Sequence, residues 1–77
     1  MTAVTVYTAP GCVQCNATTR ALTEAGIEFR EVNLAVDLAA RDYVLNDLGY
    51  SQAPIIEVDG DDHWFGFRPD RIKALAR

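Results

Sequence analysis

The sequence has few cationic residues, and this scarcity narrows the range of its partners. Of its 77 residues, seven are Lys or Arg and 11 are Asp or Glu, so that the formal net charge is -4. The single lysine is Lys73, and the arginines are scattered along the chain. A nucleic-acid-binding or membrane-surface protein needs a clustered basic patch to meet phosphates. The charge pattern therefore argues against nucleic acid and against an anionic membrane as partners.

Long apolar runs and linker-like stretches are also missing. No segment approaches the roughly 18 apolar residues of a membrane-spanning helix. Residues 1–7 lack the basic start and the long apolar run of a secretory signal, so we expect a cytoplasmic protein. With 49% hydrophobic and 23% charged residues, the chain is suited to one small globular domain, residues 1–77.

Cysteine is scarce, and its placement is informative. The chain has two cysteines, Cys12 and Cys15, with two residues between them. A disulfide here would close a loop of about four residues and add roughly 2 kcal/mol of stability, less than a bridge between distant segments. Stability alone is therefore a weak reason for this spacing. Redox chemistry explains it better, because cytoplasmic thiols are kept reduced and a cytoplasmic Cys-x-x-Cys pair commonly acts in redox catalysis.

The spacing of apolar residues predicts alternating strands and helices. Four segments rich in β-branched and aromatic residues are predicted strands: residues 4–7, 27–34, 55–58 and 63–67. Two helices are predicted from apolar spacing near 3.6 residues and a third from its initial proline: residues 13–25, residues 38–48, and the segment from Pro69 onward. Asp37 fits the N-cap of the second helix, and Asp59-Gly60 fits a tight hairpin turn. The order β-α-β-α-β-β-α predicts an α/β domain with a four-stranded mixed sheet flanked by three helices.

Cys12 lies where the first strand gives way to the first helix. Only the thiolate of a cysteine is nucleophilic, and the free N–H groups at a helix N-terminus favour negative charge. Cys15 follows one helical turn later, on the same face and within reach of a disulfide. This placement predicts that Cys12 attacks a partner's disulfide and that Cys15 then releases the reduced partner. The uncharged Val13 and Gln14 between them are expected to influence the redox potential.

Two other interpretations of the cysteine pair stay open at this point. A structural zinc site needs four ligands, and the other soft ligand in the chain is His63. A merely structural disulfide is disfavoured by its short loop. A Cys-x-x-Cys pair at the first strand–helix junction is instead a recognised sign of a thioredoxin-like redox motif. We therefore favour a dithiol redox function without a metal, and we expect His63 to be a surface strand residue.

Three segments together resemble the NrdH-redoxins, a family that is glutaredoxin-like in sequence and thioredoxin-like in activity. They are residues 7–15 with the Cys-Val-Gln-Cys motif, then Gln52-Ala53-Pro54, and then His63-Trp64-Phe65-Gly66-Phe67-Arg68-Pro69-Asp70. The resemblance covers essentially the whole chain. It implies a thioredoxin fold, no bound cofactor, and a cis peptide at Ala53–Pro54 beside the cysteine pair. We also expect a monomer, because transient docking suits a small acidic redoxin.

The resemblance also implies partners. The large subunit of a class Ib ribonucleotide reductase would accept electrons, and thioredoxin reductase would supply them from NADPH through its own FAD. The backbone of Ala53 would pair with an extended segment of the partner. The other residues expected to contact a partner lie in the same segments: Val13, Gln14, Gln52, Pro54, Trp64, Phe65, Gly66, Phe67 and Arg68.

The sequence differs from ordinary glutaredoxins where those proteins bind glutathione. They use a Gly-Gly followed by an Asp pair, and a basic residue before the cysteine motif. Here Arg68 and Pro69 replace the acidic pair, Pro69 has no amide donor, and Ala9 replaces the basic residue. We therefore expect weak glutathione binding. A glutathione-dependent glutaredoxin and an iron–sulfur-cluster-binding module remain the alternative functions.

Several residues of the last segment have two possible roles. Many NrdH-redoxins have Lys in place of Ala9 and Ser in place of Phe65, so both positions depart from the family pattern. Strand alternation puts Trp64 on the face opposite Phe65 and Phe67, and aromatic residues of a late strand more often pack in a core. Arg68 is either a solvated residue at the start of the last helix or a residue that pairs with a carbonyl or carboxylate and holds the loop near Cys12. The resemblance favours the second role.

Overall fold

The computed structural model describes residues 3–76 and has the α/β architecture expected from the sequence. Its elements in chain order are β1 (Val4–Thr8), α1 (Val13–Glu24), β2 (Arg30–Asn33), α2 (Leu38–Asp42), the π-helical turn η1 (Tyr43–Asp47), β3 (Ile55–Val58), β4 (Asp62–Phe65) and α3 (Pro69–Leu75). Within residues 3–76, no helix is long and apolar enough to cross a membrane.

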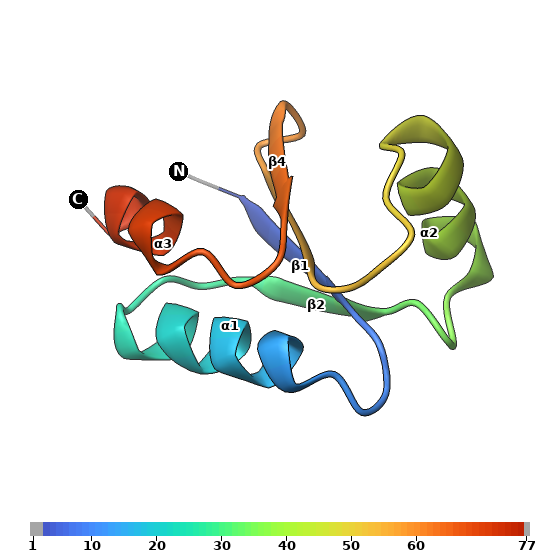
Figure 1. The fold of residues 1–77 in the computed structure, drawn as a ribbon. Helices are drawn as coiled ribbons and strands as arrows, with labels where there is room; N and C mark the ends of the chain where they lie inside the picture. The colour runs from blue at the N-terminus through green and yellow to red at the C-terminus, as the bar shows by residue number, and fades with distance from the viewer. Residues whose placement is uncertain (1–2, 77) are drawn as a thin grey trace.

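The four strands form one mixed sheet in the order β2-β1-β3-β4 (Figure 1). β1 and β2 are parallel and are connected by α1, whereas β3 is antiparallel to both of its neighbours. The β3–β4 hairpin turns at Asp59 and Gly60, which both have positive φ, as the Asp-Gly sequence predicts. This is the predicted thioredoxin fold.

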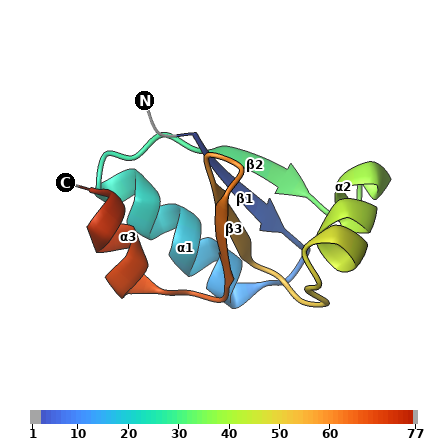
Figure 2. The same cartoon turned by 90° about the horizontal axis from the view of Figure 1, so that it is seen from above.

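Two hydrophobic cores lie on opposite faces of the sheet, because side chains alternate along each strand. On one face, Val6, Ile56 and Trp64 pack with residues of α1 and α3. On the other, Tyr7 and Ile55 pack with residues of α2 and η1. Figure 2 shows the resulting layers, with α1 and α3 on one side of the sheet and α2 on the other.

Two predicted strands are shorter or shifted in the structure. The second was expected at residues 27–34, but pairing with β1 begins at Thr5 opposite Arg30, and the Ile27 N–H bonds to the Leu22 carbonyl instead. The fourth was expected at residues 63–67, but β4 is Asp62–Phe65 and the chain turns at Gly66, whose φ is +91°. Both strands are present where the sequence predicts them, but their limits depend on the partner strand.

The second helix also differs from the prediction of one α-helix over residues 38–48. It begins as expected, because the Asp37 carboxylate accepts a hydrogen bond from the Ala40 N–H at 3.0 Å. After Asp42 it continues as η1, where the Leu48 N–H bonds to the Tyr43 carbonyl five residues back. A π-turn of this kind holds one more residue than an α-turn and occurs frequently at functional sites.

Candidate functional site: the cysteine pair

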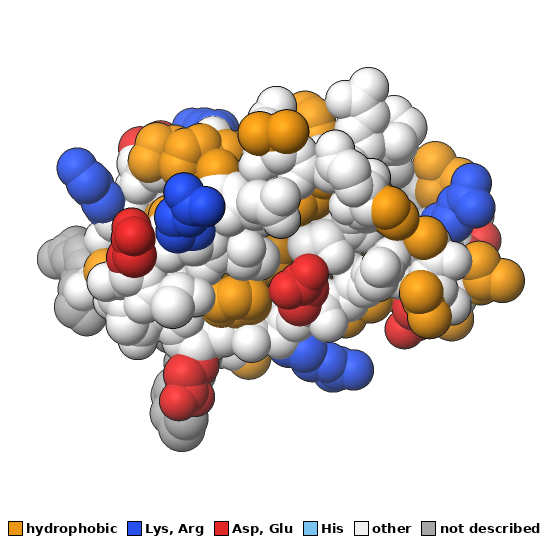
Figure 3. All heavy atoms as spheres, turned by 90° about the horizontal axis from the view of Figure 1, so that it is seen from below, with side chains coloured by type: hydrophobic (Ala, Val, Ile, Leu, Met, Phe, Trp, Pro, Cys, Tyr) orange, Lys and Arg blue, Asp and Glu red, His pale blue; other side chains and the backbone are white. Residues whose placement is uncertain are grey.

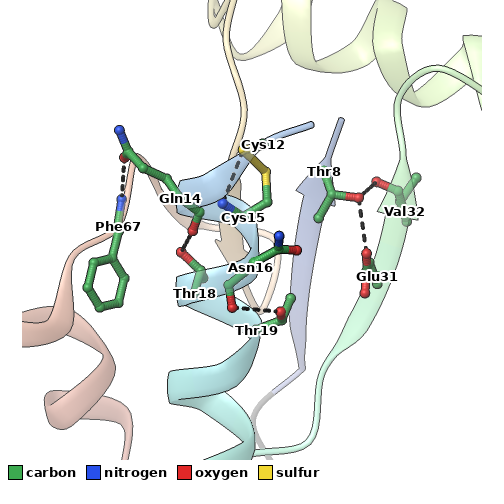
Figure 4. Close-up of a disulfide and its surroundings, with 10 residues drawn as sticks. All are labelled: Thr8, Cys12, Gln14, Cys15, Asn16, Thr18, Thr19, Glu31, Val32 and Phe67. Atoms are coloured by element: carbon green, nitrogen blue, oxygen red, sulfur yellow. Dashed lines mark hydrogen bonds between the residues drawn. A yellow bond between two sulfur atoms is a disulfide. The ribbon is translucent and has the colours of Figure 1, made fainter. Parts of the chain in front are cut away.

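Cys12 and Cys15 are joined by a disulfide at the N-terminus of α1 (Figure 4), with their Cα atoms 5.2 Å apart. Cys12 is the N-cap residue of this helix. Its Sγ accepts a hydrogen bond from the Cys15 N–H at 3.1 Å. The first turn of α1 therefore presents a backbone donor to the Cys12 sulfur, as the sequence predicts, and favours negative charge on that atom.

The two sulfurs differ in accessibility. Cys15 is only 3% exposed, Cys12 is half-buried, and Val13 between them is 80% exposed. The turn before the helix produces this arrangement, because Gly11 has a φ of +71° and lets the chain reverse between β1 and α1. Cys12 is thus the sulfur that a large partner reaches more readily.

Gln14 connects the cysteine motif to the loop after β4. Its side-chain Oε1 accepts a hydrogen bond from the Phe67 N–H at 3.1 Å, as Figure 4 shows. The neighbouring Gly66 donates its N–H to the Pro54 carbonyl at 2.9 Å, and a Cβ at Gly66 would lie 3.4 Å from the Gln14 Oε1. These contacts join the three segments on which the resemblance rests.

The Ala53–Pro54 peptide is cis, which confirms the expectation from the resemblance. Pro54 is buried, Ala53 is half-buried and Gln52 is exposed. Ala53 and Gln52 also line a cavity of about 290 Å³ between the end of β1 and η1. Arg41, Val44, Leu45 and Tyr50 line the same cavity.

The aromatic residues of the last segment separate into two sets, as the alternation predicts. Trp64 is 5% exposed in the core with α1 and α3, and its Nε1–H has no hydrogen-bond partner among residues 3–76. The Arg71 guanidinium stacks over the Trp64 ring, 4.9 Å from the ring centroid. Phe65 and Phe67 are 40% and 36% exposed. The core role thus fits Trp64, and the two phenylalanines are accessible to a partner.

Arg68 does not hold the loop near Cys12 in the predicted way. Its guanidinium pairs with Asp70, two residues away at the start of α3, at 3.0 Å. This hydrogen bond raises the pKa of Arg68 and lowers the pKa of Asp70. Gln14 holds the loop to the cysteine motif instead, because its Oε1 accepts the Phe67 N–H.

Sequence reasoning missed a set of polar contacts on the α2 side of the sheet. Glu57, on β3, is 8% exposed, and its carboxylate accepts hydrogen bonds from the hydroxyls of Tyr7 and Tyr43. His63, expected as a surface residue, is half-buried, and its Nδ1 lies 2.7 Å from the Tyr50 hydroxyl. One signal was available: a lone glutamate between apolar residues in a buried strand implies a buried partner.

Exposed apolar side chains also gather away from the cysteines. Val36, Leu38 and Leu45 are all exposed, and they lie on or beside α2 and η1. In Figure 3 hydrophobic side chains are prominent at the right-hand end, where α2 lies in Figure 1. Another group of hydrophobic side chains is visible at the upper left of this face, and smaller ones lie between them.

Comparison with known proteins places the chain among redox proteins. The glutaredoxin family profile matches residues 4–64. The glutaredoxin-like protein NrdH of Salmonella typhimurium is 44% identical over 72 residues, which are 94% of this chain and 86% of that protein.

Solved structures agree with this assignment. The NrdH-redoxin from Escherichia coli superposes with a TM-score of 0.85 at 40% identity, covering 95% of this chain and 93% of the other. Glutaredoxin 1 from Francisella tularensis superposes less well, with a TM-score of 0.72 at 25% identity, covering 97% and 94%. This chain therefore belongs to the glutaredoxin family, and within it to the NrdH-like redoxins, which are thiol–disulfide oxidoreductases.

Proposed function

We propose that this chain reduces disulfides of partner proteins, with Cys12 as the nucleophile and Cys15 as the resolving cysteine. The observation that carries the assignment is the asymmetry of the pair. Cys12 is the more exposed sulfur and receives the Cys15 N–H, whereas Cys15 is almost fully buried behind it. The more accessible, stabilised thiolate suits the attacking group, and a buried thiol suits an attack that occurs within the molecule.

The reaction consists of two thiol–disulfide exchanges. The Cys12 thiolate attacks one sulfur of the partner's disulfide, forms a mixed disulfide and releases the partner's other sulfur as a thiolate. Cys15, once deprotonated, attacks the Cys12 Sγ, so that the mixed disulfide breaks and the second partner thiolate leaves. The partner gains two electrons, and Cys12 and Cys15 lose two as their own disulfide forms.

Protein partners dock beside the cis peptide, with the Ala53 backbone pairing with an extended segment. The exposed Val13, Phe65 and Phe67 supply apolar contacts around that segment. Gln52 and Ala53 lie at the edge of the neighbouring cavity, which can receive a side chain of the segment. The partner that we propose is the large subunit of a class Ib ribonucleotide reductase, in the cytoplasm, with this chain acting as a monomer.

Thioredoxin reductase, rather than glutathione, recycles the disulfide in this proposal, using NADPH and its own FAD. Backbone donors in the loop after β4 are already occupied, because the Phe67 N–H bonds to Gln14 and the Gly66 N–H bonds to Pro54. Pro69 has no N–H, and Arg68 is paired with Asp70. The similar NrdH-redoxin from Escherichia coli is a glutaredoxin-like protein with a thioredoxin-like activity profile, which supports this choice of reductant.

Trapping of the mixed disulfide tests the two cysteine roles. The Cys15→Ser variant keeps the attacking thiol and is expected to accumulate a covalent adduct with a protein disulfide, visible by mass spectrometry and lost on reduction. The Cys12→Ser variant is the matched control and is expected to form little adduct. Equal adduct formation through Cys15 in the control would contradict the assignment.

A further inference from the structure

The hydroxyls of all three tyrosines form hydrogen bonds with two polar side chains, Glu57 and His63, on one face of the sheet. Tyr7 and Tyr43 bond to Glu57 on β3, and Tyr50 bonds to His63 on β4. Glu57 and His63 are cross-strand partners in the β3–β4 ladder. The polar groups thus form one layer beneath α2 and η1.

Glu57 is buried and depends on these phenols for compensation. A buried carboxylate is costly unless it is hydrogen-bonded, and Glu57 receives the Tyr7 hydroxyl at 3.0 Å together with that of Tyr43. Burial and then the hydrogen bond to Glu57 raise the pKa of Tyr7, and the hydrogen bond to Glu57 raises the pKa of Tyr43, because ionising either phenol would place a second negative charge beside Glu57. Tyr7 and Tyr43 are therefore both held as neutral donors.

Tyr43 and Tyr50 occupy the two ends of one segment. Tyr43 is the first residue of η1, and Tyr50 follows its end by three residues. Two backbone hydrogen bonds lie within this segment. The Leu48 N–H donates to the Tyr43 carbonyl, and the Tyr50 N–H donates to the Val44 carbonyl. The two phenols therefore attach a compact unit, residues 43–50, to β3 and β4.

This unit forms a wall of the cavity next to the cis peptide. Val44, Leu45 and Tyr50 line that cavity, and the chain passes directly from Tyr50 into Ser51, Gln52 and Ala53. Any shift of the unit therefore moves the residues through which a partner segment is expected to dock. The π-turn places one more residue between the Tyr43 carbonyl and the N–H that it accepts than an α-helical turn would.

We infer that Glu57 and His63 are positioning residues for protein substrates, acting through Tyr43 and Tyr50 on the segment that leads to Ala53–Pro54. The inference rests on the proposed function, since it concerns the docking side of the same site. It predicts an effect on recognition of protein disulfides and none on the chemistry of the cysteines. Small disulfides that reach Cys12 without contacting residues 50–53 are expected to be unaffected.

The chain offers a matched control for the test. Tyr7→Phe and Tyr43→Phe each remove one hydroxyl from the same carboxylate, but Tyr7 lies on β1 and is not part of the 43–50 unit. Tyr50→Phe removes the bond to His63 and leaves the ring in place. For each variant, the rate of a single turnover of chemically reduced redoxin would be measured against the concentration of a protein disulfide and of a small aromatic disulfide. The half-saturating concentration and the maximal rate constant from these curves are written KM and kcat below.

Tyr43→Phe and Tyr50→Phe are expected to raise KM for the protein disulfide by about three- to ten-fold at unchanged kcat, which is the signature of lost binding rather than lost chemistry. Tyr7→Phe is expected to leave KM within about two-fold. All three variants are expected to match the wild type on the small disulfide. Melting temperatures identify any variant that is partly unfolded, and Glu57→Gln, which keeps one acceptor oxygen, provides a second probe of the same contact.

Two outcomes would overturn the inference while leaving the proposed function intact. One is an equal KM for Tyr43→Phe, Tyr50→Phe and Tyr7→Phe in an active redoxin. The other is a parallel loss on small and protein disulfides, which would indicate a general loss of structure. Failure of the wild type to reduce either disulfide would instead contradict the proposed function.

Discussion

Cys12 and Cys15 differ in accessibility, so their thiols are expected to react at different rates. In the reduced protein, iodoacetamide is expected to alkylate Cys12 at least about ten-fold faster than Cys15, because Cys12 is more accessible and its thiolate lies at the helix N-terminus. The single variants Cys15→Ser and Cys12→Ser isolate each thiol, and mass spectrometry follows the modification. Equal rates in the two variants would contradict the asymmetry on which the assignment of roles depends.

Gly66 is the residue at which the loop after β4 is most sensitive to a side chain. Gly66→Ala is expected to cost about 1–3 kcal/mol of unfolding free energy, because φ is +91° and the new Cβ would approach the Gln14 Oε1 at 3.4 Å. Gly60→Ala has a similar φ of +78° with no atom within 4 Å, so it measures the backbone cost alone. Urea denaturation of the oxidised proteins gives both values, and an equal loss would show that the contact with Gln14 is unimportant.

The roles of Gln14 and Arg68 show where sequence reasoning at single residues reaches its limit. The sequence predicts the cysteine pair and its position at a helix start, because both follow from local spacing. It does not predict which side chain holds the loop after β4, because that depends on tertiary placement. Arg68 pairs with Asp70 in its own helix start, and Gln14 takes the role that Arg68 was expected to have.

At the scale of the element, substitutions of Asp37 test how much the N-cap of α2 contributes to stability. Asp37→Ala is expected to destabilise the fold by about 1 kcal/mol, because the Ala40 N–H loses its acceptor. Asp37→Asn is the matched variant, since its amide oxygen also caps a helix, and it is expected to retain most of the stability. Thermal unfolding distinguishes them; equal melting temperatures for Ala and Asn would indicate that the cap contributes little.

The elements themselves are predicted from the sequence to different degrees. β1, β3 and the hairpin turn follow from β-branched runs and from Asp59-Gly60, and the structure has them as expected. The limits of β2 could not be predicted, because they are fixed by the register with β1. The π-turn could not be predicted either, because the apolar spacing of residues 38–48 fits a regular helix and the bond from Leu48 to Tyr43 depends on the packing beneath it.

At the scale of the whole molecule, the contact between Tyr7 and Glu57 makes the free energy of unfolding sensitive to pH in the alkaline range. Burial and Glu57 raise the pKa of Tyr7 well above its ordinary value, so above about pH 10 the unfolded chain releases this proton while the folded chain keeps it. The free energy of unfolding is therefore expected to fall as pH rises, by up to about 1.4 kcal/mol per pH unit for this group.

Urea denaturation of the oxidised protein between pH 8 and about pH 11 measures this dependence. Tyr7→Phe is expected to show a shallower decline, because the group that titrates differently in the two states has been removed. Parallel curves for the wild type and Tyr7→Phe above about pH 10 would contradict the burial of an un-ionised Tyr7 beside Glu57.

The source of electrons for the intact protein tests the central claim most directly. NADPH oxidation would be followed with a protein disulfide as acceptor in two recycling systems, one with thioredoxin reductase and one with glutathione and glutathione reductase. Because the N–H groups of Phe67 and Gly66 are already bonded and Arg68 is already paired with Asp70, we predict turnover with thioredoxin reductase and little with glutathione. Turnover through glutathione alone would contradict the account and make this chain a glutathione-dependent glutaredoxin.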